Sequence, residues 1–271
     1  MDHNENCCIF DASQYTGTPD TAPCARTIDT PEIIRALDRL YEKGRENSAE
    51  EYLEHWRSEA EAIGDWRGRL SMVNELLGQY RRSSNVRAGL DSVNEALELI
   101  RDHRLGRTVS GATIMLNAAT TLKCFGRAEE SLPIFRHAAR VYADKLDPGD
   151  YRFAGLYNNM ALSYADVGDY ASAERCFELA MKTVSGCTHP ENDMAVTCCN
   201  MAEMYAKTDP GDPRIERSME RAWELLNAPD LPWDGYHAFT VSKCAPTFDY
   251  FGYFLYAMEL RDREKKIYEG T

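Results

Sequence analysis

The chain has 271 residues and a formal net charge of −13, and 44% of its residues are hydrophobic while 28% are charged. This balance is ordinary for a folded chain, and the acidity argues against nucleic acid and anionic membranes as partners, because both attract basic surfaces. No segment approaches the ~20 consecutive apolar residues of a membrane-spanning helix.

Residues 1–30 are rich in Thr, Asp, Pro and Cys and show no sustained periodicity, so we expect a flexible arm or an irregular cap. The start of the chain has no basic region followed by an apolar core, which a secretory signal would show. The nine cysteines form an odd set without paired zinc-type spacing. This usage is typical of a reducing cytosol rather than of a disulfide framework, so the expected location is cytoplasmic.

Helical periodicity begins at Thr30, which can cap a helix whose first turn contains Pro31. Apolar residues then recur three and four apart, and turns that contain glycine or proline interrupt the pattern. The expected helices span residues 31–43, 48–63, 66–81, 86–103, 110–124, 128–145, 152–166, 170–185, 192–207, 213–227, 236–251 and 253–268. Consecutive helices would pair as six helical hairpins, and the charged run at 261–266 is typical of a C-terminal cap.

The clearest hairpin covers residues 157–180. Tyr157, Ala161 and Tyr164 lie four and three residues apart, which places them on one face of a helix. Gly168 interrupts the pattern as a turn does, and a second helix then repeats the same spacing. A single hairpin of this kind cannot bury its apolar faces, so it needs neighbours stacked against it.

The sequence contains such neighbours at a nearly fixed period. Segments of similar sequence begin at Asn117, Asn159 and Asn200, which lie 42 and 41 residues apart. A period in this range is the signature of a helical solenoid. The position at which the first helix of a hairpin packs against its partner, here called the seam, recurs every 40 to 43 residues at Leu37, Leu77, Ala119, Ala161, Ala202 and Ala245.

At these residues the chain resembles a tetratricopeptide repeat protein. The central hairpin carries the family pattern at Tyr157, Met160, Ala161, Tyr164, Gly168, Ala173, Phe177 and Ala180. The period is longer than the usual ~34 residues, and in this respect the chain is similar to repeats of the kinesin light chain type. The resemblance covers about residues 31–268 and implies an all-α, right-handed α-solenoid of about six stacked hairpins, with residues 1–30 outside this domain.

The three repeated asparagines suggest a binding surface. A residue two positions from the seam lies about 200° round the helix, so Asn117, Asn159 and Asn200 point away from it. Neighbouring helices lie ~10 Å apart. This spacing equals the length of about three residues of an extended peptide, at ~3.3 Å per residue. A carboxamide can bind the C=O and the N–H of a peptide together, and the resemblance implies that asparagine at this position contacts bound peptides. The alternative is a row of polar residues on a solvated helix face.

The predicted peptide-binding groove adds neighbouring polar residues in the same register. Its members are Asn74, Arg81, Asn117, Lys123, Asn158, Asn159, Asn200, Glu203, Lys207 and Lys243. The lysines could meet a carboxylate, but for each lysine alone a solvated charge is the favoured interpretation. The first two repeats carry Arg35 and Glu75 where the carboxylate clamp of the family needs Lys and Asn, which argues against a chaperone C-terminus as the ligand.

Catalysis has little support in the sequence. His189 lies near Cys187, Cys198 and Cys199, which could suggest a Cys/His nucleophile or a zinc site. The short paired spacing of zinc ligands is missing, and a nucleophilic thiol needs an activated thiolate and an oriented base. We therefore expect no enzymatic activity, no metal and no cofactor.

The sequence thus predicts a cytoplasmic scaffold that holds an extended peptide, or a segment of a partner protein, in a concave groove. Two alternatives stay open. One is a structural or homo-oligomeric scaffold that uses its outer faces or the aromatic cluster at residues 250–256. The other is a ligand-responsive sensor of signalling peptides whose superhelical pitch changes on binding.

Overall fold

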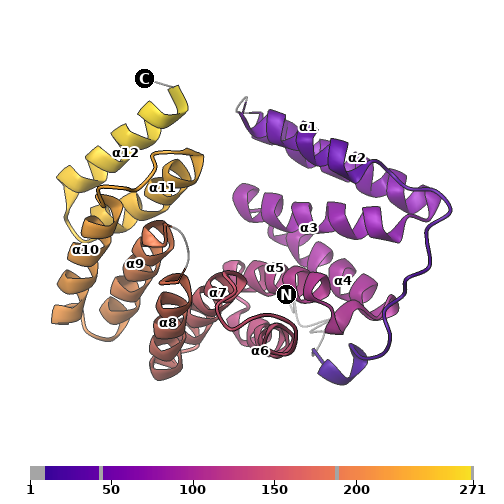
Figure 1. Ribbon diagram of the computed structural model, residues 1–271, viewed down its shortest axis with the longest axis horizontal. Coiled ribbons are helices and arrows are strands. Elements are labelled where there is room, and N and C mark those ends of the chain that lie inside the picture. Colours follow the sequence, from indigo (N-terminus) through magenta and orange to yellow (C-terminus); the bar gives the residue numbers. More distant parts are fainter. Residues whose placement is uncertain (1–9, 43–44, 187–188, 270–271) are drawn as a thin grey trace, which may run out of the picture. The chain divides into compact units, whose positions relative to one another are not determined.

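The computed structural model describes residues 10–42, 45–186 and 189–269 (Figure 1). These residues form helices and turns without a strand, so the all-α class is confirmed. The α-helices are α1 (Thr30–Glu42), α2 (Glu46–Ile63), α3 (Trp66–Ser83), α4 (Val86–Asp102), α5 (Val109–Cys124), α6 (Ala128–Lys145), α7 (Arg152–Asp166), α8 (Tyr170–Val184), α9 (Glu191–Thr208), α10 (Pro213–Leu226), α11 (Gly235–Tyr250) and α12 (Phe254–Glu269). Two short 3-10 helices are η1 (Ala12–Gln14) and η2 (Leu105–Arg107). Each expected helix is present, and the expected end at residue 43 lies outside the described residues.

The helices pair in chain order, and the chain divides into two units, Met1–Leu146 and Asp147–Thr271. The first unit contains the hairpins α1/α2, α3/α4 and α5/α6, and the second contains α7/α8, α9/α10 and α11/α12 (Figure 1). First helices of successive hairpins also lie against one another within a unit. In the first unit α3 contacts α5, and in the second α9 contacts both α7 and α11. This stacking is the arrangement that the repeat period predicts.

Burial confirms the predicted seam. All six seam residues are at most 1% exposed, namely Leu37, Leu77, Ala119, Ala161, Ala202 and Ala245. Across the α7/α8 seam, Phe177 of α8 is also fully buried. The small alanine at the seam allows close packing of the two helices.

Local chemistry fixes the turns between helices. Gly168 has φ of 80°, in the left-handed region that favours glycine at the end of a helix. The carboxylate of Asp169 then accepts a hydrogen bond from the backbone N–H of Ser172 at 3.0 Å and caps α8. Asp212 caps α10 in the same way, and Pro213 occupies the first helical position, where its missing N–H is not needed.

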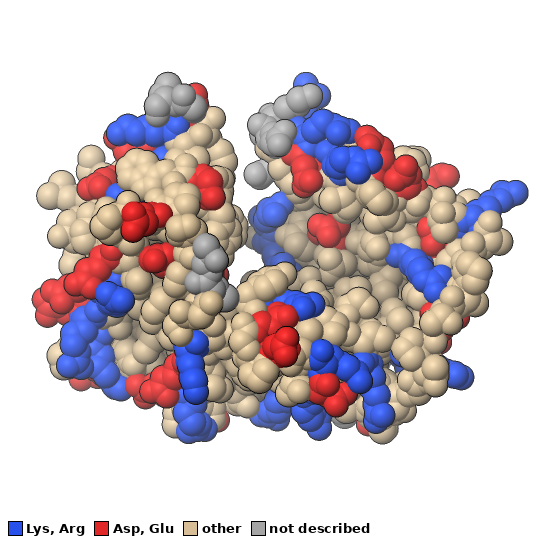
Figure 2. Space-filling view, viewed as in Figure 1, with Lys and Arg blue, Asp and Glu red and all other residues tan. Residues whose placement is uncertain are grey.

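Charged side chains of both signs are interspersed over the surface. Figure 2 shows Lys and Arg beside Asp and Glu, with uncharged areas between them. The face in this view therefore lacks the continuous basic field that nucleic-acid binding uses. In the residues that the structure describes, no helix combines the length and the apolar character needed to cross a bilayer.

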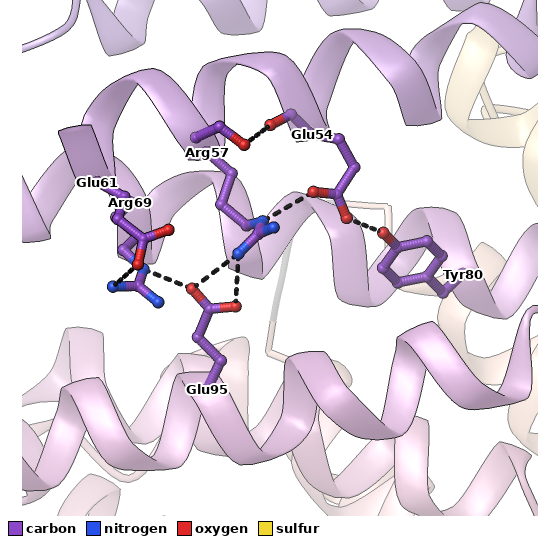
Figure 3. A network of polar contacts seen from close by, with 7 residues as sticks. Glu54, Arg57, Glu61, Arg69, Tyr80 and Glu95 are labelled. Atoms are coloured by element: carbon purple, nitrogen blue, oxygen red, sulfur yellow. Dashed lines mark hydrogen bonds and ion pairs between the residues drawn. The ribbon is translucent and has the colours of Figure 1, made fainter.

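A charged network joins three helices of the first unit (Figure 3). Glu95 of α4 accepts hydrogen bonds from Arg57 of α2 at 3.1 Å and from Arg69 of α3 at 2.5 Å. Arg57 also donates to Glu54 at 2.8 Å, and Glu54 accepts a further bond from the Tyr80 hydroxyl. Hydrogen bonds between ionised groups are stronger than neutral ones, so one carboxylate shared by two guanidinium groups fixes the register of α2, α3 and α4.

The described part of the N-terminal segment, residues 10–29, contacts the helices of the first unit. Tyr15 is buried, and its ring centroid lies 6.2 Å from that of His137 in α6. Asp20 makes two contacts with His103, the residue that follows α4. Its backbone N–H donates to the His103 carbonyl at 3.0 Å, and its carboxylate lies 3.1 Å from Nδ1 of His103. The segment thus reaches the end of α4 and one side of α6. The boundary between arm and domain at residue 31 stays a prediction.

Arg263 of α12 is buried although it lies in the charged run at residues 261–266. It is 3% exposed, and it donates hydrogen bonds to the carbonyl of Leu226 at 2.6 Å and to Oδ1 of Asn227 at 2.8 Å. It also pairs with Glu259 at 2.9 Å. Its guanidinium therefore joins α12 to the end of α10.

His237 of α11 lies beside this arginine in the interior of the second unit. Its Nδ1 is 2.8 Å from Oδ1 of Asn192 in α9, and its Nε2 is 3.4 Å from the Arg263 guanidinium. Burial and the positive charge of Arg263 together lower the pKa of His237 to about 4. A neutral imidazole thus joins α9 to α11.

Replacing His237 with Gln should remove part of the dependence of stability on pH. An unfolded histidine binds a proton near pH 6.5, while folded His237 stays neutral down to about pH 4. As pH falls, the unfolded chain therefore takes up the proton first, and this histidine should cost up to about 3 kcal/mol of stability in that interval. The free energy of unfolding, measured with denaturant between pH 7.5 and pH 4, should fall less steeply with pH for His237→Gln than for His55→Gln, an exposed control. Equal declines would contradict the assignment.

Replacing Ala161 with Leu should overpack the α7/α8 seam. The site is fully buried, so the larger side chain should lower the free energy of unfolding by about 1–3 kcal/mol. The matched control is Ala171→Leu, which makes the same change at an exposed position of α8. Urea denaturation measures both variants, and an unchanged midpoint for Ala161→Leu would show that the seam is assigned incorrectly.

Candidate functional site

The second unit has a cavity of about 420 Å³ along its first helices α7, α9 and α11. We call it the inner cavity. Five of the ten predicted groove residues line it, namely Asn158, Asn159, Asn200, Glu203 and Lys243. They come from three different hairpins, and the stacking of the first helices brings them together.

A hydrogen bond between two asparagines joins α9 to α7 at the inner cavity. Nδ2 of Asn200 donates to Oδ1 of Asn158 at 3.1 Å. Asn159 instead donates to the carbonyl of Gly155 in its own helix at 2.9 Å. The partner of Asn200 is therefore Asn158, one position before the residue that the sequence register selects. Each carboxamide has two N–H donors and an acceptor oxygen with two lone pairs, so this single bond leaves both groups with further capacity.

Two more hydrogen bonds join α9 to α11 on the other side of the cavity. Glu203 accepts a bond from the hydroxyl of Thr247 at 2.6 Å, and Asp193 accepts one from Tyr236 at 2.6 Å. Burial, followed by this bond to Asp193, raises the pKa of Tyr236. The phenol therefore stays protonated and donates to the carboxylate at neutral pH.

An aromatic ring and a cation form the α11 edge of the inner cavity. Phe239 is 49% exposed although it is a large apolar residue. Nζ of Lys243 lies 5.3 Å from the centroid of its ring, within the range of a cation–π interaction. Leu162 and Val196 add apolar lining from α7 and α9. The cavity thus presents amide groups, acidic groups, one ammonium and an apolar surface within reach of a single bound segment.

The cysteines near this site are not activated. A hydrogen bond with Cys244, then burial, raises the pKa of Cys199 well above its usual value, and burial raises that of Cys198 to about 11. A thiol is a nucleophile or a metal ligand only as a thiolate. His189 is exposed, and Cys187 lies outside the described residues. Across the described part of the chain, no three His, Cys, Asp or Glu side chains form a metal-binding group.

Three other predicted residues form a similar bonded set in the first unit. Nδ2 of Asn117 donates to Oδ1 of Asn74 at 2.8 Å, which joins α5 to α3. Arg81 donates to the carbonyl of Asn117 at 3.2 Å and to the hydroxyl of Thr121 at 2.8 Å. Each unit therefore has an asparagine bond between first helices of successive hairpins.

The remaining two predicted residues lie outside the inner cavity. Lys207 pairs with Asp166 at 2.8 Å and borders a separate cavity of about 390 Å³ at the end of α9. Lys123 is half-buried in the last turn of α5. Whether any of the ten residues contacts a ligand stays a prediction.

Several lining residues were not selected from the sequence. The chief ones are Tyr236, Phe239 and Thr247, all from α11. Two of them could have been found from the repeat period, because Tyr236 follows its partner Asp193 by 43 residues and Thr247 follows Glu203 by 44. Phe239 carries no such polar signal, since an aromatic residue in a helix is more often in the core.

Comparison with known proteins agrees with this architecture. The tetratricopeptide repeat family matches residues 153–184, which contain most of α7 and α8. The crystal structure of BtubC (BKLC) from P. vanneervenii is similar over 90% of this chain and 92% of its own, with 16% identity and a TM-score of 0.50. A variant of a Podosopora anserina kinesin light chain protein with nearly identical TPR-like repeats is similar over 73% of this chain and 94% of its own, with 15% identity and a TM-score of 0.50. None of the curated proteins matches the sequence.

The fold is therefore a stack of tetratricopeptide-type hairpins. The chain contains a tetratricopeptide repeat at residues 153–184, and its fold is similar to that of solved structures with kinesin light chain-like repeats. The resemblance predicted from the sequence is confirmed.

Proposed function

We propose that the protein is a binding scaffold that holds an extended peptide, or a segment of a partner protein, in the inner cavity. The bonded pair Asn158–Asn200 at the wall of a cavity of about 420 Å³ is the observation that carries this proposal. Tetratricopeptide repeats generally serve protein interactions, and the site has the groups that a peptide needs. The proposal gives the protein no catalytic role.

The chemistry of the cavity walls supports an extended ligand. The carboxamides of Asn158 and Asn200 can each bind a backbone C=O and N–H while their mutual bond holds them in place. These hydrogen bonds to the backbone do not depend on the ligand's side chains. Selectivity then comes from α11, where Phe239 offers an apolar contact and Lys243 can pair with a carboxylate. Because the groups are held by packed helices, little side-chain entropy is lost on binding.

The described cysteines support a cytoplasmic location for this scaffold. Six of them are free thiols, and four of these are buried (Cys176, Cys198, Cys199 and Cys244). Buried free cysteine behaves as a small apolar residue, and it persists most readily in a reducing compartment.

Self-association is a second candidate function, favoured by the last helix. Phe254, Leu255 and Met258 of α12 are 63%, 78% and 63% exposed. They lie on one face, opposite the buried Ala257 and Leu260. Contiguous exposed apolar groups of this kind often mark interaction surfaces. A mass that rises with protein concentration, and falls back in a Leu255→Glu variant, would support this role.

Peptide selection followed by calorimetry tests the principal proposal. Peptides selected on the wild-type protein from a displayed random library should bind the Asn158→Ala/Asn200→Ala variant about tenfold or more weakly, because at least two backbone hydrogen bonds are lost. The Asn94→Ala variant makes the same chemical change on α4 and should bind like wild type.

Two results would contradict the proposal. One is unchanged affinity in the double variant. The other is a failure of the library to yield any peptide whose affinity depends on the inner cavity. Thermal unfolding of each variant separates a loss of contacts from a loss of folding, because a double variant that melts well below wild type would show that the asparagine bond is mainly structural.

A further inference from the structure

A second cavity of the second unit lies between α8 and α10, the second helices of their hairpins. We call it the α8–α10 groove. Its volume is about 440 Å³, and its apolar lining residues are Met181, Cys198, Met201 and Tyr205. It shares no lining residue with the inner cavity, because α9 turns one face to each.

Three arginines of α10 border this groove. Arg214, Arg217 and Arg221 lie three and four residues apart and therefore share one face of the helix. The glutamates of α10 at positions 216 and 220 fall on a different face, where their charges act on Tyr253 beside α12. Although the chain has a net charge of −13, the side chains that line this groove include more arginines than carboxylates. Glu178 of α8 is the one acidic residue among the lining side chains.

The three arginines differ in how firmly they are held. Arg214 pairs with Asp212 at 2.7 Å and with Glu174 at 3.1 Å, and its guanidinium lies 4.0 Å from the ring centroid of Tyr205. Arg217 is exposed, and no hydrogen bond or ion pair holds it within the described part of the chain. Arg221 pairs only with the exposed Glu224 on its own helix, at 2.9 Å.

Exposed ion pairs of this kind contribute little stability, so a carboxylate of a partner can replace Glu224. One arginine is therefore fixed as part of the groove wall. The other two are available to anions that approach from outside.

The first unit shows what can bind on the corresponding side of a hairpin. His137 of α6 and Arg221 of α10 hold the same place in their hairpins, each directly before a fully buried alanine. In the first unit the ring of Tyr15, which directly follows the short helix η1 in the N-terminal segment, lies beside His137. The carboxylate of Asp20 in the same segment pairs with a basic side chain, His103. A segment outside the helical hairpins, with an apolar anchor and a carboxylate, thus packs on this side of one unit.

We propose that the α8–α10 groove binds an acidic, extended segment of a partner protein. An apolar side chain of the segment packs on Met181, Met201 and Tyr205, and its flanking carboxylates pair with Arg217 and Arg221. This site is separate from the inner cavity, so the protein has two docking surfaces on opposite sides of α9. Because arginines outnumber carboxylates along the groove, the partner segment should be acidic. The flexible methionines allow the groove to accept apolar side chains of different shapes.

Fluorescence anisotropy with three labelled peptides tests the chemistry of the ligand. The probe GSDELMDEGS combines carboxylates with an apolar centre. In GSNQLMNQGS the carboxylates are replaced by amides, and in GSDESSDEGS the apolar centre is removed. We expect the first peptide to bind the full chain about tenfold or more tightly than either analogue, since both kinds of contact contribute. Its affinity should fall as salt is raised, because the arginines are exposed.

Charge-reversal variants test the location. Arg217→Glu should weaken binding of GSDELMDEGS about tenfold or more, and Arg221→Glu should do the same. Lys182→Glu is the matched control, with the same charge change on α8 outside the groove, and it should bind within about twofold of wild type. Lys243→Glu changes the inner cavity and should also leave the affinity unchanged, which separates this proposal from the proposed function.

Three outcomes would overturn the proposal. The first is no saturable binding of GSDELMDEGS at millimolar concentration in low salt. The second is a loss of binding in either lysine variant. If Lys182→Glu loses as much affinity as the arginine variants, the effect is one of general charge. If Lys243→Glu loses affinity, the peptide binds in the inner cavity. The third is a doubled mass in light scattering that Arg217→Glu abolishes, because the groove would then be covered by a second copy of the chain. Variants are compared only where their melting temperatures match that of wild type, and Arg217→Ala replaces Arg217→Glu if the latter unfolds.

Discussion

Close packing at the seam between the two helices of each hairpin is the constraint on which the rest of the structure depends. In four of the six hairpins the seam residue of the first helix is a fully or almost fully buried alanine, as at Ala161. With the side chain this small, the helices approach closely and their rotation about their own axes is fixed. That rotation decides which residues face the neighbouring hairpin and which face solvent. The positions of both proposed binding surfaces follow from it.

Helix α9 shows the consequence most clearly. Ala202 occupies its seam, Asn200 and Glu203 face the inner cavity, and Met201 and Tyr205 face the α8–α10 groove. One helix therefore supplies polar groups to one surface and apolar groups to the other. The inner cavity is suited to a peptide backbone, and the groove is suited to an apolar side chain between carboxylates. A partner could in principle occupy one surface while the other stays available, since no lining residue is shared.

Much of the fold could be predicted from the sequence because it depends on periodicity. The helices and the seam are set by the spacing of apolar residues and by turns such as that at Gly168. The sequence placed both Asn158 and Asn159 in the groove, but spacing alone does not show that Asn158 is the one that bonds Asn200. Arg263 could not be placed, since a charged residue in a charged run carries no sign of the carbonyl and amide that surround it in the folded unit. The two cavities depend on how side chains from three helices pack, and this is absent from any single repeat.

In the proposed binding mode, carboxamides held in register by stacked hairpins bind an extended ligand. The most direct measurement is the NMR signal of the side-chain amides of Asn158 and Asn200 during titration with a selected peptide. These signals, assigned by their loss in the alanine variants, should shift in step with binding, while the side-chain amide of Asn94 on α4 should not move. Saturating binding that leaves both Asn158 and Asn200 unshifted would contradict this binding mode and would place the ligand elsewhere on the protein.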